Sequence, residues 1–358
     1  TADQMGDLAA MASAIPGVQL LLGADGAADA FSVFGLGGDQ NNTQLNGLNF
    51  GDAALPRDAS VSTSLATSSY DVSRGGFSGG QLQVGTRSGS NFIRRTLSGN
   101  LITPQMQWLD QTGLATGQQY TNMSLGGSAS GPIKADRAFF NTSFQYDRRL
   151  QDLQTLLSES SLGFETAGVA ADSVARLLNI LGASNVPITV GGYSPQRIVN
   201  RATFLNSFDY VQANSNRGNT FAITLSGNYS GTAPVGGGGG GFGGFGGGAA
   251  SLFTPTRDGT RDSYGGALQA RHSGMLGFQG IFTESTIGYN VSRNASDPFA
   301  ILPAGTVRVN SQLVDGSAAV SSLLFGGSPS LNTASTNASL AANNTMSWFS
   351  NDNRHRVK

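Results

Sequence analysis

After Asn91, apolar and polar side chains alternate along segments of about ten residues or more. In one of them Phe140, Phe144 and Tyr146 alternate with Asn141 and other polar residues. Successive side chains of a strand point to opposite faces, so this pattern predicts strands with one apolar and one polar face. Strands of soluble proteins average about 5–6 residues, whereas membrane-spanning strands need about 9–11. The pattern therefore favours an outer-membrane β-barrel over a soluble β-sandwich or β-helix.

Seven strands of this kind are predicted, and an eighth begins near Arg354; the seven cover residues 95–102, 121–129, 137–147, 201–211, 220–229, 263–272 and 279–293. Their connections differ in length. Those at 130–136 and 212–219 are short, and those at 148–200 and 231–262 are long. Short turns at one end and long loops at the other are typical of outer-membrane barrels.

The two long loops differ in character. Within 148–200, residues 170–181 place Val174, Leu177, Leu178 and Leu181 on one face of a predicted helix. The loop at 231–262 carries runs of glycine punctuated by phenylalanine, a flexible composition. This tract is interpreted either as low-complexity filler or as a loop that sweeps the mouth of a pore.

The first 92 residues have shorter elements. A helix is predicted over 4–14, ended by Pro16 and Gly17, and short strands follow at 18–22, 31–36, 43–50, 61–70 and 81–87. Glycine-rich turns connect them. The sequence therefore predicts a small α/β unit ahead of the long strands.

Composition narrows the class of protein further. The chain has 358 residues, with 51 Gly, 12% charged residues, a net charge of −1 and no Cys. Disulfide scaffolds and zinc–thiolate sites are thus excluded, and the balance of charge does not favour nucleic-acid binding. The chain starts at Thr1 without a signal-peptide pattern, and we interpret it as an internal piece of a longer protein.

Candidate catalytic and metal motifs are weak. Residues 76–80 match G-x-S-x-G, but a strand follows where a nucleophile elbow needs a helix, and the chain has only two His, His272 and His355. A glycine-rich turn explains the motif better. Asp258 and Asp262 are close in sequence and could bind Ca²⁺, although loop carboxylates are usually just solvated. We therefore expect no enzyme activity, no cofactor and no metal.

The segment 15–92 resembles the plug domain of TonB-dependent outer-membrane receptors, and most closely that of the Oar-like receptors. The resemblance lies in residues 15–18 (IPGV), 31–36 (FSVFGL), 39–48 (DQNNTQLNGL), 55–59 (LPRDA), 70–80 (YDVSRGGFSGG) and 84–91 (VGTRSGSN). Residues 130–147 look like an early barrel strand of the same family.

The resemblance implies a mostly β protein with a plug domain at 1–92 and an incomplete antiparallel transmembrane β-barrel at 93–358. It implies a receptor of the bacterial outer membrane that takes up a substrate with energy transmitted by TonB. Its partners are then the TonB complex of the inner membrane, contacted through a segment not in this chain, outer-membrane lipid and a transported ligand. A surface adhesin or non-transporting barrel is the alternative, and a soluble glycan-binding β-protein is a third interpretation.

Two sets of plug residues are predicted to carry the function. An apical loop is expected to touch substrate, and charged side chains are expected to join plug and barrel. The loop residues are Asp39, Gln40, Asn41 and Asn42, and the contact residues are Arg57, Asp58, Arg74 and Arg87.

Overall fold

The computed structural model describes residue 12 and the ranges 15–22, 28–49, 55–66, 80–115, 117–212, 218–236, 252–276, 281–313, 316–350 and 356–357. Apart from Ala12, the predicted helix at 4–14 lies outside these residues, as do Arg74 and most of the glycine-rich tract. The described chain forms three bodies, which we call the wall, the plug and the cap.

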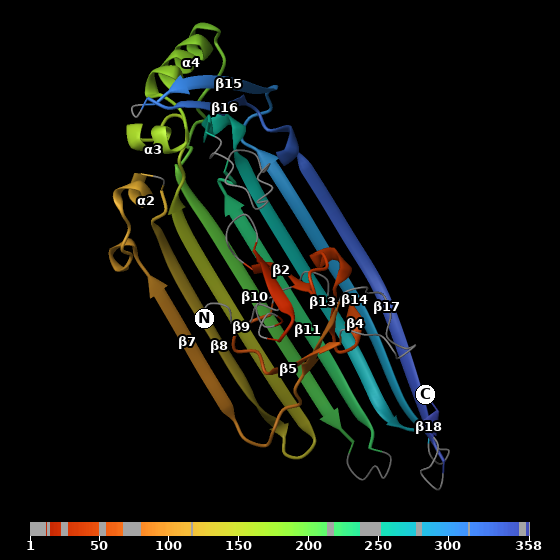
Figure 1. Ribbon diagram of the computed structural model, residues 1–358. Helices are drawn as coiled ribbons and strands as arrows, with labels where there is room; N and C mark the ends of the chain where they lie inside the picture. Colours follow the sequence, from red (N-terminus) through yellow and green to blue (C-terminus); the bar gives the residue numbers. More distant parts are fainter. Residues whose placement is uncertain are drawn as a thin grey trace.

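The wall is one nine-stranded sheet in the order β18-β17-β14-β13-β11-β10-β9-β8-β7, and every neighbouring pair is antiparallel (Figure 1). Among the described strands, β7 and β18 form its two edges, so the sheet is an open, incomplete barrel, as predicted. The strands are β7 (Arg94–Ile102), β8 (Tyr120–Lys134), β9 (Ala138–Asp152), β10 (Gln196–Val211), β11 (Thr220–Ala233), β13 (Gly259–Met275), β14 (Ile281–Pro298), β17 (Thr333–Phe349) and β18 (Arg356–Val357).

The predicted alternation is confirmed along the wall. On β9 and β10, Ser143 and Ser207 are each 1% exposed, whereas Phe144 and Phe208 on the opposite face are 46% and 49% exposed. The polar face is thus the covered one and the apolar face the open one, the reverse of a soluble sheet.

Strand β17 is absent from the sequence prediction, which passes from residue 293 to Arg354. Its outward face carries Leu340, Met346 and Trp348, but its other outward positions are small or polar and resemble the serines and asparagines that alternate with them; they are Ala334, Thr336, Ala338, Ala342 and Asn344. This weak contrast between the two faces hides the period of two, although β17 pairs with β14 over its whole length.

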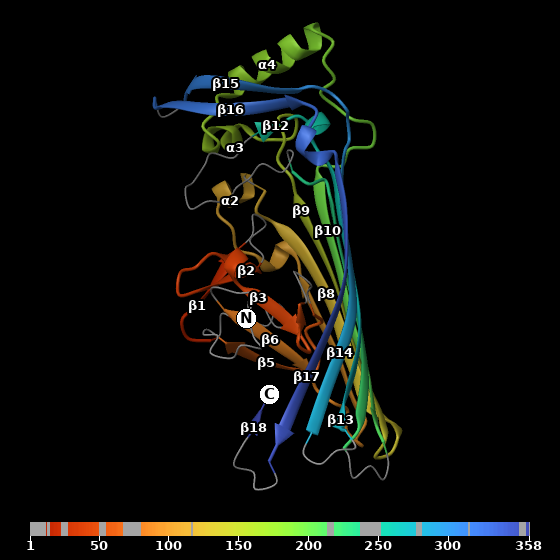
Figure 2. The same ribbon diagram turned by 90° about the vertical axis from the view of Figure 1, so that its right-hand side faces the viewer.

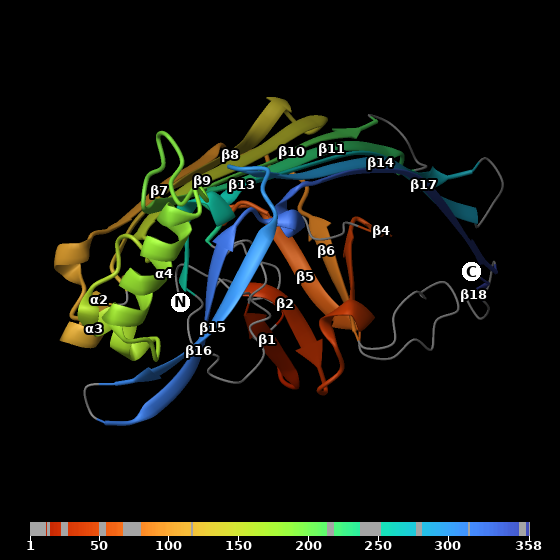
Figure 3. The ribbon, with the colours of Figure 1, turned by 90° about the horizontal axis from the view of Figure 1, so that it is seen from above.

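The plug consists of two small sheets on the concave, polar face of the wall (Figures 2 and 3). In the larger sheet β3 and β6 are parallel and the other pairs are antiparallel. Its buried core includes Leu45, Leu82 and Val84, and Leu205 and Ala267 of the wall join this core. The strands are β1 (Val18–Leu22) and β2 (Ala28–Val33) in one sheet, and β3 (Asn42–Leu45), β4 (Leu48–Asn49), β5 (Val61–Ala66) and β6 (Gln81–Thr86) in the other.

The cap is built from three long loops at one end of the wall (Figure 2). The β9–β10 loop supplies α3 (Ser161–Thr166) and α4 (Ala171–Ala183), the β11–β13 loop supplies β12 (Leu252–Phe253), and the β14–β17 loop supplies β15 (Ala304–Gln312) and β16 (Ala318–Gly326). β12 pairs in parallel with β16, and β16 pairs with β15. One apolar core, which includes Leu156, Phe164, Val174, Leu177, Leu181, Leu252 and Leu323, joins all three loops.

The predicted helix within the first long loop is confirmed as α4, with Val174, Leu177 and Leu181 buried. The short helices elsewhere are η2 (Gly38–Gln40), η3 (Pro104–Met106), α2 (Gln111–Ala115), η4 (Pro255–Arg257) and η5 (Pro329–Leu331). None of the helices in the described part of the chain is both long and apolar enough to cross a membrane.

Candidate functional site

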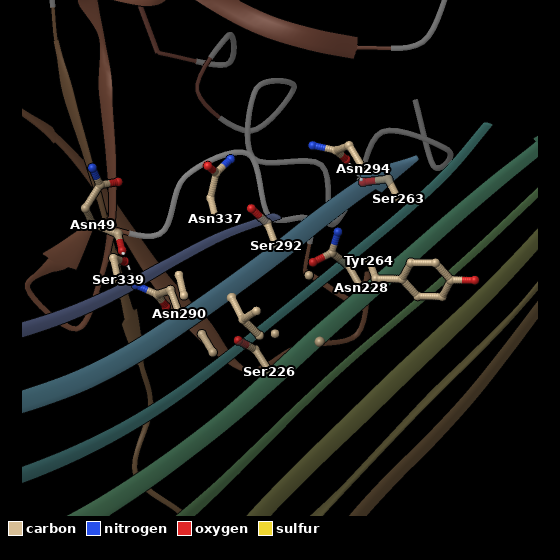
Figure 4. A pocket seen from close by; sticks show the side chains of 16 residues that line it. Asn49, Ser226, Asn228, Ser263, Tyr264, Asn290, Ser292, Asn294, Asn337 and Ser339 are labelled. Atoms are coloured by element: carbon tan, nitrogen blue, oxygen red, sulfur yellow. Dashed lines mark hydrogen bonds between the residues drawn. The ribbon is translucent and has the colours of Figure 1, made fainter. Parts of the chain in front are cut away.

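A polar chamber of about 360 Å³ lies between the tip of the plug and the wall (Figure 4). Asn49, at the end of β4, closes one side, and β11, β13, β14 and β17 form the other. All of its lining residues are uncharged. The polar ones are Asn49, Ser226, Asn228, Ser263, Asn290, Ser292, Asn294, Asn337, Ser339 and Tyr264, and the ring of Tyr264 points away from the chamber (Figure 4).

Small residues on β13 make room for these amides and hydroxyls. A Cβ atom added to Gly265 would lie 2.2 Å from Oδ1 of Asn228, so a larger residue here would displace that amide. Ser263 Oγ donates to Asn294 Oδ1 at 2.6 Å, across the pair of strands. The chamber is therefore a surface of neutral donors and acceptors, suited to water and to polar solutes.

Asn46 connects the plug to the wall beside the chamber. It occupies the β3–β4 turn with φ of 50°, and Gly47 follows with φ of 86°, as an Asn-Gly hairpin turn requires. Its Oδ1 accepts from the Thr86 backbone N at 2.9 Å, and its Nδ2 donates to Thr224 Oγ1 and Gln269 Oε1 at 3.3 and 3.5 Å. One neutral side chain thus joins strands of both bodies.

Two of the four predicted contact residues lie at the wall. The backbone N of Arg57 donates to Gln145 Oε1 at 2.7 Å, and Ser98 Oγ donates to Asp58 Oδ2 at 2.7 Å. The Arg87 side chain is exposed, and its backbone N donates within the plug to Ser60 O at 3.1 Å. Arg74 is outside the described residues.

The predicted substrate loop spans η2 and the start of β3. Nδ2 of Asn41 donates to Phe31 O, and its Oδ1 accepts from Gly80 N at 2.7 Å. The backbone N of Asn42 donates to Gly80 O at 2.9 Å. These bonds hold the loop to the rest of the plug, and the Gln40 side chain is exposed. Asp39 lies in η2 beside it.

The two carboxylates considered for Ca²⁺ are engaged separately. Asp258 is completely buried, and its Oδ1 accepts from the backbone N of Gly236 and Gly259 at 2.9 and 2.8 Å. Asp262 accepts from Tyr229 OH at 3.0 Å. In the described part of the chain no three His, Cys, Asp or Glu residues gather as a metal site would require.

Asp258 holds the base of the cap. Tyr193 OH, from the β9–β10 loop, donates to Asp258 Oδ2 at 3.5 Å, and Phe299 N donates to the Asp258 carbonyl at 2.8 Å. Burial raises the pKa of Tyr193 well above its usual value, and the nearby Asp258 carboxylate raises it further. Three loops therefore converge on one buried carboxylate.

Comparison with known proteins supports the fold. No protein-family model and no curated protein matches the sequence. The outer membrane transporter YddB of Escherichia coli matches with a TM-score of 0.56 at 12% identity, over 97% of this chain and 45% of that one. A point mutant of the ferric enterobactin receptor PfeA of Pseudomonas aeruginosa matches with a TM-score of 0.52 at 10% identity, over 96% and 44%.

The fold is thus that of a plugged outer-membrane barrel, and the chain spans about 45% of the length of the solved structures it matches. The fold expected from the resemblance to TonB-dependent outer-membrane receptors, a plug followed by the first part of a barrel, is confirmed.

Proposed function

We propose that the protein is a TonB-dependent receptor of the bacterial outer membrane, which takes up a substrate through a plugged β-barrel. TonB, engaged through a segment outside this chain, would supply the energy from the inner membrane. Transport of this kind makes and breaks no covalent bond, so the proposal includes no enzyme activity. The observation that carries it is the position of the plug, which covers the polar face of a sheet whose other face is apolar (Figure 3).

The outward face of the wall has the dimensions of a lipid-facing surface. On β14 the outward side chains are uncharged from Ile281 to Val291, and Arg293 is the first charged one above them. About 11 residues at about 3.3 Å each, tilted by about 40°, span roughly 28 Å, close to the apolar band of an outer-membrane barrel. Aromatic pairs such as Tyr229 and Tyr264, with ring centroids 5.0 Å apart, lie at the upper border.

The contacts of the plug suit a body that must move. Apart from the apolar contact with Leu205 and Ala267, its side chains meet the wall through hydrogen bonds, among them those of Asn46 and that of Asp58 with Ser98. A hydrogen bond between neutral groups contributes only about 0.5–1.5 kcal/mol net, and one to a carboxylate such as that of Asp58 about 1.5–3 kcal/mol, because water replaces it when the groups separate. Such an interface holds the plug firmly at rest and still lets a pulling force shift it. A barrel that serves only in adhesion does not need a plug that can shift under force.

The proposal is tested by the accessibility of one buried wall residue in living cells. Thr224 is 3% exposed, contacts Asn46 and lies beneath the plug. These 358 residues contain no Cys, so Thr224→Cys, made in a receptor whose remaining segments are also freed of Cys, gives a single thiol for a membrane-impermeant maleimide. We expect labelling in energised cells to fall several-fold when TonB is deleted or the proton gradient is collapsed.

The control is Ser184→Cys at the exposed end of α4, which should label equally in all strains. Equal labelling of Thr224→Cys with and without TonB would refute the proposal, and would favour a non-transporting barrel.

A further inference from the structure

We propose that the substrate of this receptor is a small oxyanion, with carboxylate, phosphate or sulfonate groups, which binds to four arginines on the inward face of the wall. This inference rests on the proposed function and assigns its substrate class. The four residues, which we call the arginine belt, are Arg149 on β9, Arg197 and Arg201 on β10, and Arg261 on β13.

Strand register brings the belt together. Arg149 pairs with Val199, so Arg197 and Arg201 lie diagonally on either side of it on the next strand. Diagonal neighbours in an antiparallel sheet are about 7–8 Å apart, within reach of one ligand for long side chains. Val199 also pairs with Thr232, and Thr232 pairs with Arg261, which places Arg261 at the same height as Arg149.

The belt faces the same side as the plug. On β9 the inward residues Ser143 and Gln145 precede Arg149 at steps of two, and the β9–β10 register runs without a shift. Gln145 accepts the backbone N–H of Arg57 in the plug. Arg149 is four residues further along the strand, about 13 Å above that contact. The belt therefore lies between the plug and the cap, where a substrate entering from the cap side would meet it.

Charge is strongly unbalanced in these rows. Beside the four guanidinium groups, the described part of the wall contributes one carboxylate, that of Asp147. Asp147 pairs with Arg201 and accepts from Gln145 Nε2 at 2.8 Å. Asp258 above the belt already accepts two backbone N–H groups. Arg197 and Arg201 have further partners of their own, whereas Arg149 and Arg261 donate to the uncharged Gln151 and Ser296. An anion would therefore offset the cost of placing their like charges close together.

Two of the guanidinium groups are held in place. The Arg149 guanidinium carbon lies 4.4 Å from the ring centroid of Tyr120, and Nη2 donates to Gln151 Oε1 at 3.5 Å. Arg261 Nε donates to Ser296 Oγ at 3.2 Å. A planar guanidinium presents paired N–H donors that match the two oxygens of an oxyanion, and holding it beforehand lowers the entropy lost on binding.

The test uses the purified full-length receptor and a fluorescent pyrene trisulfonate as the anionic probe, followed by fluorescence anisotropy. The double variant Arg149→Gln, Arg261→Gln should bind the dye at least 10-fold more weakly than the wild type. Arg148→Gln, Arg293→Gln is the matched control, because it removes two arginines from the outward face of β9 and β14. It should change the affinity less than 2-fold.

Absence of saturable dye binding by the wild type, or an equal loss in both double variants, would overturn the proposal. The pair Arg149→Lys, Arg261→Lys keeps the charge and should recover most of the affinity; a loss as large as with Gln would count against an electrostatic site. TonB-dependent labelling of Thr224→Cys without dye binding would overturn the substrate class alone. Dye binding without TonB-dependent labelling would overturn the receptor function and leave the anion site standing.

Discussion

Replacing Leu323 by Ala should open the cap while leaving the wall intact. Leu323 is 0% exposed on β16, where it pairs with Val307 of β15 and with Leu252 of β12. It belongs to the same core as Leu177 of α4. All three cap loops therefore lose packing at once when this side chain is shortened.

The magnitude follows from the burial. Leu→Ala at a fully buried site costs about 2–5 kcal/mol, the sum of lost transfer energy and the cavity left behind. At about 1.4 kcal/mol for each factor of ten, the open population of the cap should rise about 30-fold to a few thousand-fold. The wall is held by backbone ladders that Leu323 does not touch, so its stability should not change.

The assay is cleavage by external protease on intact cells, with the folded barrel followed by its heat-dependent mobility on gels. Cap cleavage should accelerate by at least about 30-fold. Val320→Ala is the control, because Val320 lies on the same strand but is 66% exposed, and it should change the rate by less than about threefold. Equal cleavage of the two variants would refute the conclusion that Leu323 holds the three cap loops together. Loss of the folded barrel in Leu323→Ala would refute the independence of cap and wall.

Three further predictions concern the wall and the base of the cap. Leu268→Arg, on the outward face, should lower the stability of the barrel by about 2–4 kcal/mol and so reduce the yield of folded, heat-modifiable protein. Asn337→Arg, on the inward face, should change neither quantity. Gly259→Ala should abolish assembly in the same assay, because its Cβ would lie 2.2 Å from a backbone oxygen of β14, whereas Gly266→Ala, whose nearest atom is at 3.8 Å, should be tolerated. Burial raises the folded pKa of Tyr193 above its unfolded value, so its contribution to cap stability is complete below about pH 10 and lost above it. Ultraviolet titration should show a late-ionising tyrosine that is lost in Tyr193→Phe; if the wild type and the variant gave identical curves, that reasoning would be wrong.

The wall could be predicted from sequence because its two faces meet different surroundings at every residue. The contrast between Phe144 and Ser143 is visible in the chain itself, and so is its repetition along β9. Strand β17 was not predicted, since Leu340, Met346 and Trp348 share its outward face with alanines, a threonine and an asparagine that differ little from the serines opposite. The cap could not be predicted either, because its core joins side chains as distant in sequence as Leu177 and Leu323.

The candidate site was also hard to predict, because its residues depend on partners that are distant in sequence. Sequence reasoning selected Arg57 and Asp58 as charged residues of the plug, but it could not name the Gln145 and Ser98 partners that docking supplies. The prediction of one strand over 43–50 was wrong, because Asn46 and Gly47 form a turn between β3 and β4. The role of Asn46 could not be predicted either, because its side-chain partner Thr224 is 178 residues away. The arginine belt needs the register of four strands, without which its members are isolated charges.

The shared core of the cap has a consequence for how such loops diversify. A change in α4 alters the cavity that β16 must fill, so substitutions in three distant stretches of the gene are coupled. Exchange of a single loop between related receptors should give misfolded surfaces, whereas exchange of all three together should preserve them. New specificities on this scaffold are thus expected to be inherited as a set, by joint replacement of the segments.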